Sequence, residues 1–284
     1  MNKLGIGTVQ FGCPYGISNK QGQVPEEEVA RILRTAREHG LNTLDTASLY
    51  GNAEEVLSHA DLSGFRLVTK TTKLDTALSR EENTQRFRQG FENSLRLLAP
   101  HGQLYGCLFH EANDLLGEDG NALWEAMESY KKEGRLQKIG VSVYTPAQLM
   151  QVIERYAIDL VQFPLNLLDQ RFLPLIAELK AAHVEIHVRS AFLQGLLLMP
   201  QEEISPWFNE IKPILARIPG ENRLRTALDF VLSVQGVDRV IVGVTTHQEL
   251  EEILRAAQAP RSGTNYTSLA IEDEKYTLPF NWER

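Results

Sequence analysis

Four residues of types suited to proton transfer stand at or near the ends of short apolar segments. Asp45 ends one segment and Tyr50 follows it by five residues, while Lys70 and His110 end two later segments. A tyrosine has an ordinary pKa near ~10, and a neighbouring lysine cation favours its ionised form. A carboxylate can hold that lysine in place, and a neutral imidazole can donate a hydrogen bond. These residue types therefore indicate acid catalysis if the fold brings the four side chains together.

Each of the four residues also has an ordinary structural interpretation. Asp45 could cap the turn after its segment, and Tyr50 could fill a surface groove. Lys70 and Asp45 could form a structural ion pair, because such networks also shift pKa values. His110 could be a hydrogen-bonded histidine at a strand end. The catalytic interpretation therefore requires that all four residues meet at one place.

The apolar pattern predicts eight strands that are nearly all followed by helices. The expected strands are residues 4–8, 41–44, 65–69, 104–109, 137–141, 159–163, 184–188 and 239–242. The expected helices lie between Pro25 and Gly40 and at residues 83–98, 123–132, 146–156, 173–182, 207–216, 223–235 and 248–257. No hairpin signal separates the strands, so the sheet should be parallel. This order predicts an α/β protein with a single (β/α)8 TIM barrel, and favours it over an open doubly wound sheet.

Length, charge and cysteine content are consistent with one soluble barrel domain. No linker or composition break divides residues 1–284, and residues 265–284 are expected to form a C-terminal tail over one end of the barrel. The net charge of -8 argues against a nucleic-acid partner. Residues 1–5 lead directly into the first expected strand, so we expect no signal peptide, and no apolar run approaches membrane-spanning length. Cys13 and Cys107 lack metal-ligand or redox spacing, so we expect a cytoplasmic protein without a metal site.

In such a barrel the active site lies where the carboxyl ends of the strands meet. Asp45, Lys70 and His110 would end the second, third and fourth strands, and Tyr50 would lie just beyond the second. The barrel therefore predicts that these four residues share one face of the molecule.

The segments around these residues resemble the motifs of the aldo-keto reductase superfamily. The matching segments are Asp-Thr-Ala-x-x-Tyr-Gly (45–51), Thr69-Lys70, Leu108-Phe109-His110, the stretch from Gly134 to Ser142, Val161-Gln162-Phe163 and Ile241-Val242-Gly243. The resemblance covers almost the whole chain and implies a divergent bacterial-type member that reduces an aldehyde or ketone with NADPH or NADH. It implies hydride transfer from nicotinamide, Tyr50 as proton donor, Lys70 and Asp45 as its support, and His110 as orienting group.

The resemblance also implies a set of cofactor-binding residues. Ser142, Gln162 and Asn166 would surround the nicotinamide amide, and the loop after Gly243 would lie near the phosphates. In that loop Thr245 and Thr246 precede a helix, and Glu249 has capping-box spacing to Thr246. The helix start could therefore bind an anion, although both threonines could equally be caps and nothing more.

Three positions depart from the family's pattern. Val143 follows Ser142 where the family has asparagine, which removes one hydrogen bond to the amide. Arg189 replaces the ring that usually stacks on nicotinamide, and its planar guanidinium could stack there or bind an acidic substrate. Thr245 replaces a basic residue that pairs with the adenosine 2′-phosphate. We expect NADPH to bind in preference to NADH, but with weaker discrimination than in the family.

Two other functions are compatible with such a barrel. One is a non-catalytic nicotinamide-binding barrel with a regulatory or assembly role. The other is a lyase acting on sugar phosphates, in which Lys70 would form a Schiff base while Tyr50 and Asp45 would lack a role. For the reductase, the small-molecule carbonyl substrate would bind between the loops at residues 11–23, 105–116 and 196–207.

Overall fold

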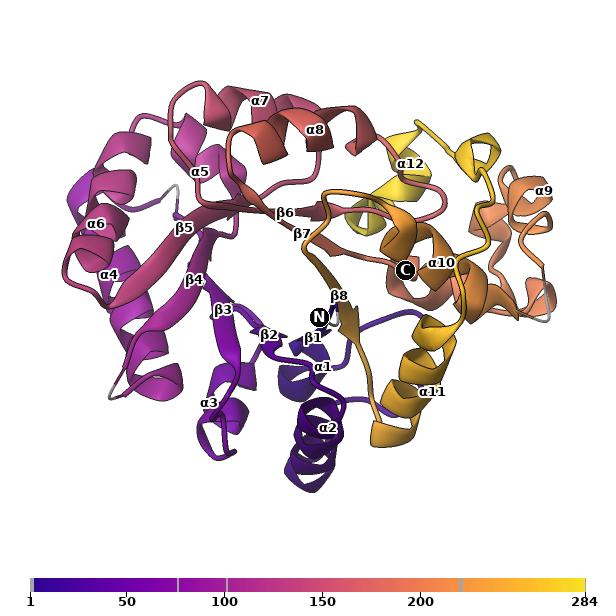
Figure 1. Ribbon diagram of the computed structural model, residues 1–284. Helices are drawn as coiled ribbons and strands as arrows, with labels where there is room; N and C mark the ends of the chain where they lie inside the picture. Colours follow the sequence, from indigo (N-terminus) through magenta and orange to yellow (C-terminus); the bar gives the residue numbers. More distant parts are fainter. Residues whose placement is uncertain (1–2, 76, 101, 220–221, 284) are drawn as a thin grey trace.

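Eight short strands close into a parallel barrel in the computed structural model, which describes residues 3–75, 77–100, 102–219 and 222–283 (Figure 1). The strands are β1 (Leu4–Gly7), β2 (Thr43–Asp45), β3 (Arg66–Lys70), β4 (Leu104–Phe109), β5 (Leu136–Ser142), β6 (Leu160–Pro164), β7 (Glu185–Arg189) and β8 (Arg239–Gly243). Each strand pairs with the next in the chain, and β8 pairs with β1 to close the barrel. The (β/α)8 TIM barrel that the sequence predicts is therefore confirmed.

Helices surround the strands and connect their ends (Figure 1). The α-helices are α1 (Val9–Gly12), α2 (Glu26–Glu38), α3 (Ala53–Ser58), α4 (Arg80–Leu98), α5 (Ala112–Leu116), α6 (Gly120–Lys132), α7 (Pro146–Ile153), α8 (Ile176–Ala181), α9 (Lys212–Leu215), α10 (Arg223–Ser233), α11 (His247–Gln258) and α12 (Glu274–Thr277). The 3-10 helices are η1 (Leu173–Leu175), η2 (Leu193–Leu198), η3 (Gln201–Glu203), η4 (Pro206–Phe208), η6 (Thr267–Leu269) and η7 (Pro279–Asn281).

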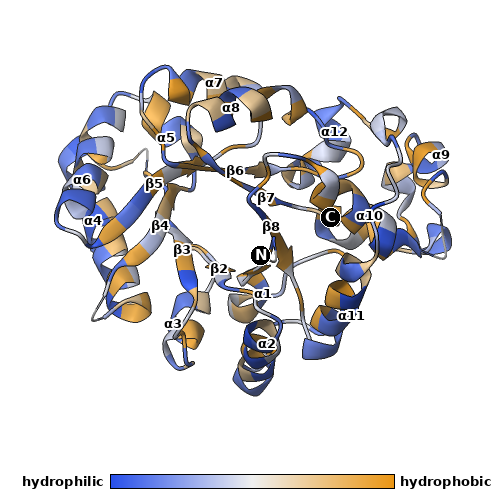
Figure 2. Ribbon diagram, in the orientation of Figure 1, coloured by the Kyte–Doolittle hydropathy of each residue, from blue (hydrophilic) through white to orange (hydrophobic). Residues whose placement is uncertain are grey.

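The helix α2 shows how an amphipathic pattern attaches a helix to the barrel. Its apolar side chains at Val29, Ile32, Leu33 and Ala36 are buried, as their spacing predicts. Figure 2 shows hydrophilic residues elsewhere along this helix. Gly40 lies in the left-handed region with φ 72°, where the missing side chain allows the chain to turn toward β2. Burial of each large apolar side chain stabilises the fold by about 1.5–3 kcal/mol.

The helix α4 begins three residues earlier than the sequence pattern predicts. Ser79 precedes it and accepts a hydrogen bond from the backbone N–H of Glu82, and the Glu82 carboxylate accepts one from the Ser79 N–H. This capping box satisfies two N–H groups that have no partner within the helix. The first turn of α4 is polar, so an apolar pattern alone does not detect it.

Two predicted helices are divided in the structure, and a proline lies at each division. Residues 173–182 form η1 followed by α8, with Pro174 inside η1. Residues 207–216 form the end of η4 and then α9, with Pro213 in the first turn of α9. Proline has no backbone N–H to donate and fixes its φ angle, so it is tolerated at a helix start but interrupts a continuous helix.

A polar cluster closes the barrel at the amino-terminal ends of the strands. Tyr105 donates a hydrogen bond to the Glu185 carboxylate over 2.5 Å, and the His187 ring lies 2.8 Å from its other oxygen. Burial would raise the pKa of Glu185, but its bonds to His187, Lys138 and Tyr105 lower it further than burial raises it. The prediction that Tyr105 lies in a substrate loop is therefore wrong, because the start of β4 lies opposite the active-site face.

The C-terminal residues 265–283 pack along the barrel through their own short helices. Glu274 forms an ion pair with Arg171 over 2.7 Å, and Trp282 packs edge-on against Phe208 with ring centroids 4.9 Å apart. The Phe280 ring lies edge-on to Tyr144, which follows β5. The tail therefore reaches the carboxyl-end face of the barrel, where the candidate active site lies.

No helix in the described part of the chain is long and apolar enough to cross a membrane.

Candidate active site

A buried ion pair joins the ends of β2 and β3. The Lys70 ammonium is 1% exposed and donates to Asp45 Oδ2 over 2.6 Å, to the Thr46 carbonyl over 3.0 Å and to the Tyr50 hydroxyl over 3.2 Å. These three bonds use all three ammonium hydrogens. Burial by itself lowers the pKa of Lys70, but the attraction of Asp45 outweighs it and the net pKa is raised. Lys70 is therefore a fixed cation beneath the tyrosine.

The bond from Lys70 determines how the Tyr50 hydroxyl can act. An ammonium group can only donate, so the Tyr50 oxygen accepts and its own hydrogen is free to point into the cavity that Tyr50 lines. Burial raises the pKa of Tyr50, while the charge of Lys70 opposes this rise without cancelling it. The sequence-based expectation of a pKa moved toward neutrality is therefore not met in this structure. Tyr50 keeps its proton at neutral pH and can donate it.

His110 lies beside Tyr50 at the end of β4. The two ring centroids are 5.7 Å apart, and the rings are nearly perpendicular. Burial, followed by the charges of Lys70 and Arg189, lowers the pKa of His110 to about 3. Its Nδ1 is buried without a hydrogen-bond partner among the described residues. The ring is therefore neutral near pH 7 and has one N–H to donate, as the sequence predicts.

The backbone at Tyr50 is held by a close contact with α1. A Cβ atom added at Gly12 would lie 1.7 Å from the Tyr50 carbonyl oxygen and 2.5 Å from the Ala53 amide nitrogen. Gly51, which follows Tyr50, has φ 56° and lies against the Gly12 carbonyl in the same way. Only glycine permits this approach of two backbone segments. The Gly12–Gly51 contact therefore fixes the backbone position from which the Tyr50 side chain reaches the Lys70 ammonium.

Replacing Gly12 with alanine is expected to lower turnover by about tenfold or more, because an error of about 1 Å in a catalytic group has a large effect. The added methyl group must push the Tyr50 segment away from Lys70. Gly102→Ala is the matched control, since a Cβ there would meet no atom within 4 Å. Single-turnover reduction rates of the two folded variants test this expectation. Equal rates in both would show that Tyr50 is not positioned by α1.

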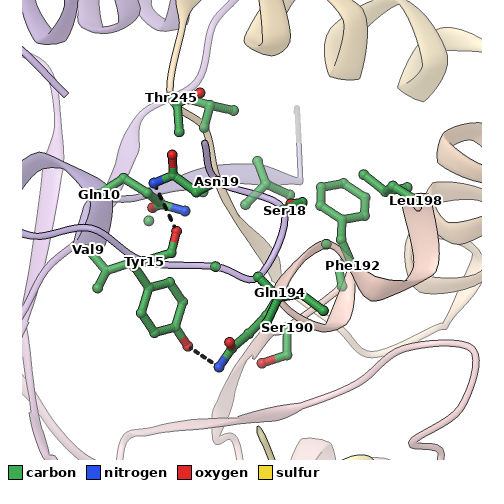
Figure 3. Close-up of a pocket in the computed structure, with 18 of the residues that line it drawn as sticks. Val9, Gln10, Tyr15, Ser18, Asn19, Ser190, Phe192, Gln194, Leu198 and Thr245 are labelled. Carbon is green, nitrogen blue, oxygen red and sulfur yellow. Dashed lines mark hydrogen bonds between the residues drawn. The ribbon is translucent and has the colours of Figure 1, made fainter. Parts of the chain in front are cut away.

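A cavity of about 730 Å³ extends from these catalytic candidates. Figure 3 shows part of its lining, including Tyr15, Gln194 and Thr245. Asp45, Tyr50 and His110 line one part of it, and the end of β8 with the start of α11 lines another. The loop after β1 and the segment after β7 line most of the remainder. These two loops meet above the cavity, because Ile17 N donates to the Gln194 carbonyl over 3.1 Å and Gln194 Nε2 donates to the Tyr15 hydroxyl over 3.1 Å. Of the loop at residues 105–116, only His110 lines the cavity, so that predicted substrate loop is corrected to one residue.

The end of β6 offers a buried acceptor for a ligand amide. Gln162 Nε2 donates to Asp45 Oδ1 over 2.7 Å, and because a carboxylate only accepts, the amide must face Asp45 through its nitrogen. Its Oε1 is then buried and has no partner among the described residues. Ser142 pairs with Gln162 across β5 and β6 and lines the cavity. Ser142 therefore fits the amide of a nicotinamide. The Gln162 oxygen is a free acceptor next to Ser142, but Gln162 is fully buried and is not among the residues that line the cavity.

Asn166 does not join this part of the site. Its side-chain carbonyl accepts from Leu168 N and Asp169 N, and its Nδ2 donates to the Ser190 carbonyl. It is fully buried and is not among the residues that line the cavity. The amide is occupied by the turn after β6, so the prediction of a direct cofactor contact is corrected to a supporting role.

Arg189 ends β7 and lines the cavity as a half-buried cation. Its guanidinium lies over the Tyr144 ring at 4.3 Å from the centroid and donates to the Val143 carbonyl over 3.2 Å. The Val143 side chain is fully buried and does not line the cavity. Tyr144 is a cavity residue that the sequence motifs do not indicate, and its place just after β5 is the only local signal for it. The cavity wall at the end of β7 is therefore formed by a guanidinium stacked on a tyrosine ring.

The loop after β8 differs from its predicted anion site. Thr246 caps α11 by accepting from the Glu249 N–H over 3.1 Å. The Glu249 carboxylate accepts from Thr245 N over 2.7 Å and from the Thr245 hydroxyl over 2.9 Å, where a capping box would use Thr246 N. Gly243 and Thr245 both line the cavity, and a Cβ at Gly243 would lie 2.6 Å from the Gln10 side chain. A carboxylate of the protein itself thus occupies the groups expected to bind an anion.

Fold and site together define a (β/α)8 barrel in which a tyrosine is hydrogen-bonded to a buried lysine–aspartate pair at the carboxyl ends of the strands. The model of the Aldo/keto reductase family matches residues 3–270, and the chain belongs to this family. It is accordingly an oxidoreductase of the aldo-keto reductase type, a family that uses nicotinamide cofactors and small-molecule carbonyl substrates. Among the described residues, no group of three or more His, Cys, Asp or Glu side chains is placed to hold a metal ion.

Comparisons with individual proteins agree with this assignment. The chain is 25% identical to the uncharacterized oxidoreductase YqkF of Bacillus subtilis over 286 residues, which cover 91% of this chain and 89% of the relative. It is 30% identical to the uncharacterized oxidoreductase YtbE of the same organism over 188 residues, or 62% of this chain and 63% of that one. The fold matches the holo form of aldo-keto reductase AKR11C1 from Bacillus halodurans with a TM-score of 0.75 and 21% identity, covering 97% and 95% of the two chains.

Proposed function

We propose that this protein reduces an aldehyde or a ketone to an alcohol, with NADPH or NADH as reductant and Tyr50 as proton donor. The observation that supports this most is the hydrogen bond from Lys70 to the Tyr50 oxygen. It leaves the Tyr50 proton free to point into the cavity beside a neutral His110. A carbonyl oxygen between these two donors would receive two hydrogen bonds, which strengthen as negative charge develops on it.

Each residue of the site has a distinct role in the proposed proton transfer. When bound, the nicotinamide supplies the hydride that reduces the carbonyl carbon. His110 donates its N–H to the carbonyl oxygen and orients it, and Tyr50 then transfers its hydroxyl proton to the forming alkoxide. The tyrosinate that remains lies 3.2 Å from the Lys70 ammonium, whose charge stabilises it. Asp45 keeps Lys70 in place and also receives the Gln162 amide.

Proposed cofactor contacts follow from the same geometry. Ser142 and the free Gln162 oxygen would hold the nicotinamide amide, and Arg189 would lie against the ring or bind an acidic group of the substrate. Gly243, Thr245 and Thr246 would lie toward the phosphates and the adenosine. The sequence by itself predicts NADPH in preference to NADH, and this order stays a prediction. The backbone N–H and hydroxyl of Thr245, which the sequence offers to an anion, are bonded to the Glu249 carboxylate.

The lyase alternative receives no support from the site. A Schiff-base lysine must lose its proton before it attacks a carbonyl carbon. The Asp45 carboxylate, in spite of burial, raises the pKa of Lys70, and all three of its hydrogens are in use. The non-catalytic alternative gives no reason for a tyrosine hydroxyl to lie in the cavity with a buried lysine bonded to its oxygen.

A panel of aldehydes and ketones tests the proposed activity. The purified protein is expected to oxidise NADPH or NADH, followed as loss of absorbance at about 340 nm, in the presence of at least one carbonyl compound and with formation of the matching alcohol. Small acidic and hydroxylated aldehydes belong in the panel because Arg189 lines the cavity. If the protein binds the reduced cofactors but turns over no carbonyl, it is a binding protein and the reductase proposal fails.

A further inference from the structure

The amino-terminal end of α11 carries carboxylates toward the cavity. Glu249 lies in its first turn, and Glu252 follows one turn later, so both project from the same face of the helix. Glu249, Glu252 and Ile253 line the cavity, together with Thr245 from the loop before the helix. This wall therefore presents two negative charges where the resemblance to the family places the adenosine half of the cofactor.

The N–H groups at this helix start are already bonded to carboxylates of the chain. Glu249 accepts from Thr245 N and from the Thr245 hydroxyl, and the Glu28 carboxylate of α2 accepts from His247 N over 2.7 Å. The Glu28 carboxylate also lies 2.6 Å from the His247 ring. A helix start attracts an anion through such free N–H groups. Here the N–H groups of Thr245 and His247 are already bonded to carboxylates, so a phosphate would have to displace one of these carboxylates to bind either group.

The cations that line the cavity do not offset these charges. They are Lys20 and Arg189 among the described residues. The Arg189 guanidinium is held on the Tyr144 ring, on the side of the catalytic residues. Lys20 lies 3.6 Å from the Glu203 carboxylate, and both side chains are largely in solvent, where an ion pair is weak. Arg255, in the last turn of α11, is not among the described residues that line the cavity, so it does not offer a guanidinium to a 2′-phosphate there.

We propose that Glu249, assisted by Glu252, selects NADH over NADPH by accepting hydrogen bonds from the adenosine ribose hydroxyls and repelling a 2′-phosphate. A carboxylate accepts and cannot donate, which matches a ribose diol and opposes a dianion. This inference rests on the proposed function, because it assumes that the cavity binds a nicotinamide dinucleotide. It reverses the cofactor order that the sequence alone predicts.

Direct binding measurements test the inference without relying on activity. Dissociation constants for NADH and NADPH are measured by calorimetry or fluorescence quenching at one low ionic strength. The wild-type protein is expected to bind NADH about tenfold to a hundredfold more tightly, the effect of one or two like charges near a protein surface. Raising the salt concentration to about 0.5 M should narrow this ratio, because screening weakens charge repulsion.

The variant Glu249→Gln removes the charge but keeps the shape, and its amide oxygen can still accept from Thr245 N. It is expected to bind NADPH about tenfold more tightly than the wild type, while NADH binding changes by less than about threefold. Glu252→Gln should act in the same direction with a smaller effect. Glu251→Gln is the matched control, because it makes the same charge change on α11 but does not line the cavity.

The outcomes separate this inference from the reductase proposal. NADPH binding as tight as NADH binding in the wild type would overturn the inference and leave the reductase proposal intact. A Glu249→Gln variant that behaves like Glu251→Gln would also overturn it, provided that circular dichroism shows both to be folded. Failure of the wild-type protein to bind either dinucleotide would overturn the reductase proposal and the inference together.

Discussion

Replacing Tyr50 with phenylalanine is expected to lower the rate of carbonyl reduction by about 10²-fold or more, the contribution of a positioned general acid. The ring remains in place, so its edge-on contact with His110 and the cavity wall are preserved. Only the hydroxyl that accepts from Lys70 is lost. Dissociation constants of the reduced cofactors should therefore stay within about twofold of the wild-type values. Single-turnover rates measured beside these constants give the result.

The control for this change removes a buried hydroxyl away from the site. Tyr156 is buried and donates to the Leu115 carbonyl over 3.0 Å, so Tyr156→Phe loses a comparable hydrogen bond. It should reduce stability by about 1 kcal/mol and leave the reduction rate unchanged. If Tyr50→Phe reduced carbonyls as fast as Tyr156→Phe, another group would be the proton donor.

The pH dependence of the wild-type rate provides a second measure of Tyr50. Burial raises its pKa, and a general acid must be protonated to act, so reduction should persist at neutral pH and decline only as the pH rises through this raised pKa. The pKa of His110 is about 3, so no loss of rate from its protonation is expected between about pH 5 and 8. The residual activity of Tyr50→Phe should lack the alkaline decline.

Lys70→Met and Asp45→Asn are each expected to lower turnover by about 10²-fold or more, and the double variant should lose far less than the product of the two losses. Each single change leaves a buried partner without its counter-charge. Without Lys70, the tyrosinate formed in the reaction loses the cation 3.2 Å away. Without Asp45, Lys70 and Gln162 both lose the carboxylate that positions them.

The same variants should show a parallel pattern in stability. Removing one member of a buried pair costs about 3–5 kcal/mol, and removing both costs less than the sum because no lone charge remains. Urea denaturation of the three variants measures this free energy of unfolding. The exposed pair Lys132 and Glu128 on α6 is the control, with losses below about 0.5 kcal/mol that simply add. Additive stability losses and multiplicative rate losses at Lys70 and Asp45 would show that the two residues act independently.

Strand ends were predictable from the sequence because the rule that places them is local. Apolar segments that stop at Asp45, Lys70 and His110 define strands, and parallel strands in a barrel direct all their carboxyl ends to one face. The spacing of the acid, the lysine and the histidine along the chain was therefore enough to predict that they share a face. The family motif added Tyr50, which lies beyond the strand and has no pattern of its own.

The sequence did not allow us to predict which side chains form hydrogen bonds with groups from distant segments of the chain. The sequence contains Asn166 and Gln162 as two similar amides near one strand end. Only the structure shows that the Asn166 side-chain oxygen accepts hydrogen bonds from Leu168 N and Asp169 N, while the buried Gln162 oxygen has no partner among the described residues. Which hydrogen-bonding groups remain unused depends on every neighbour in three dimensions, and an unused group is what a ligand can bind.

What the sequence alone determined was the barrel, the helix faces and the residues that end the strands, since these follow from periodicity and chain direction. The tertiary structure alone decided the direction of the Tyr50 pKa shift, because burial and the Lys70 charge act in opposite senses and only the folded surroundings set their balance. It alone also placed the Glu249 carboxylate on Thr245, since a flexible side chain at a helix start can point to solvent or back to the loop. The local sequence pattern predicts the backbone position from which a side chain projects, whereas packing determines which atoms that side chain contacts.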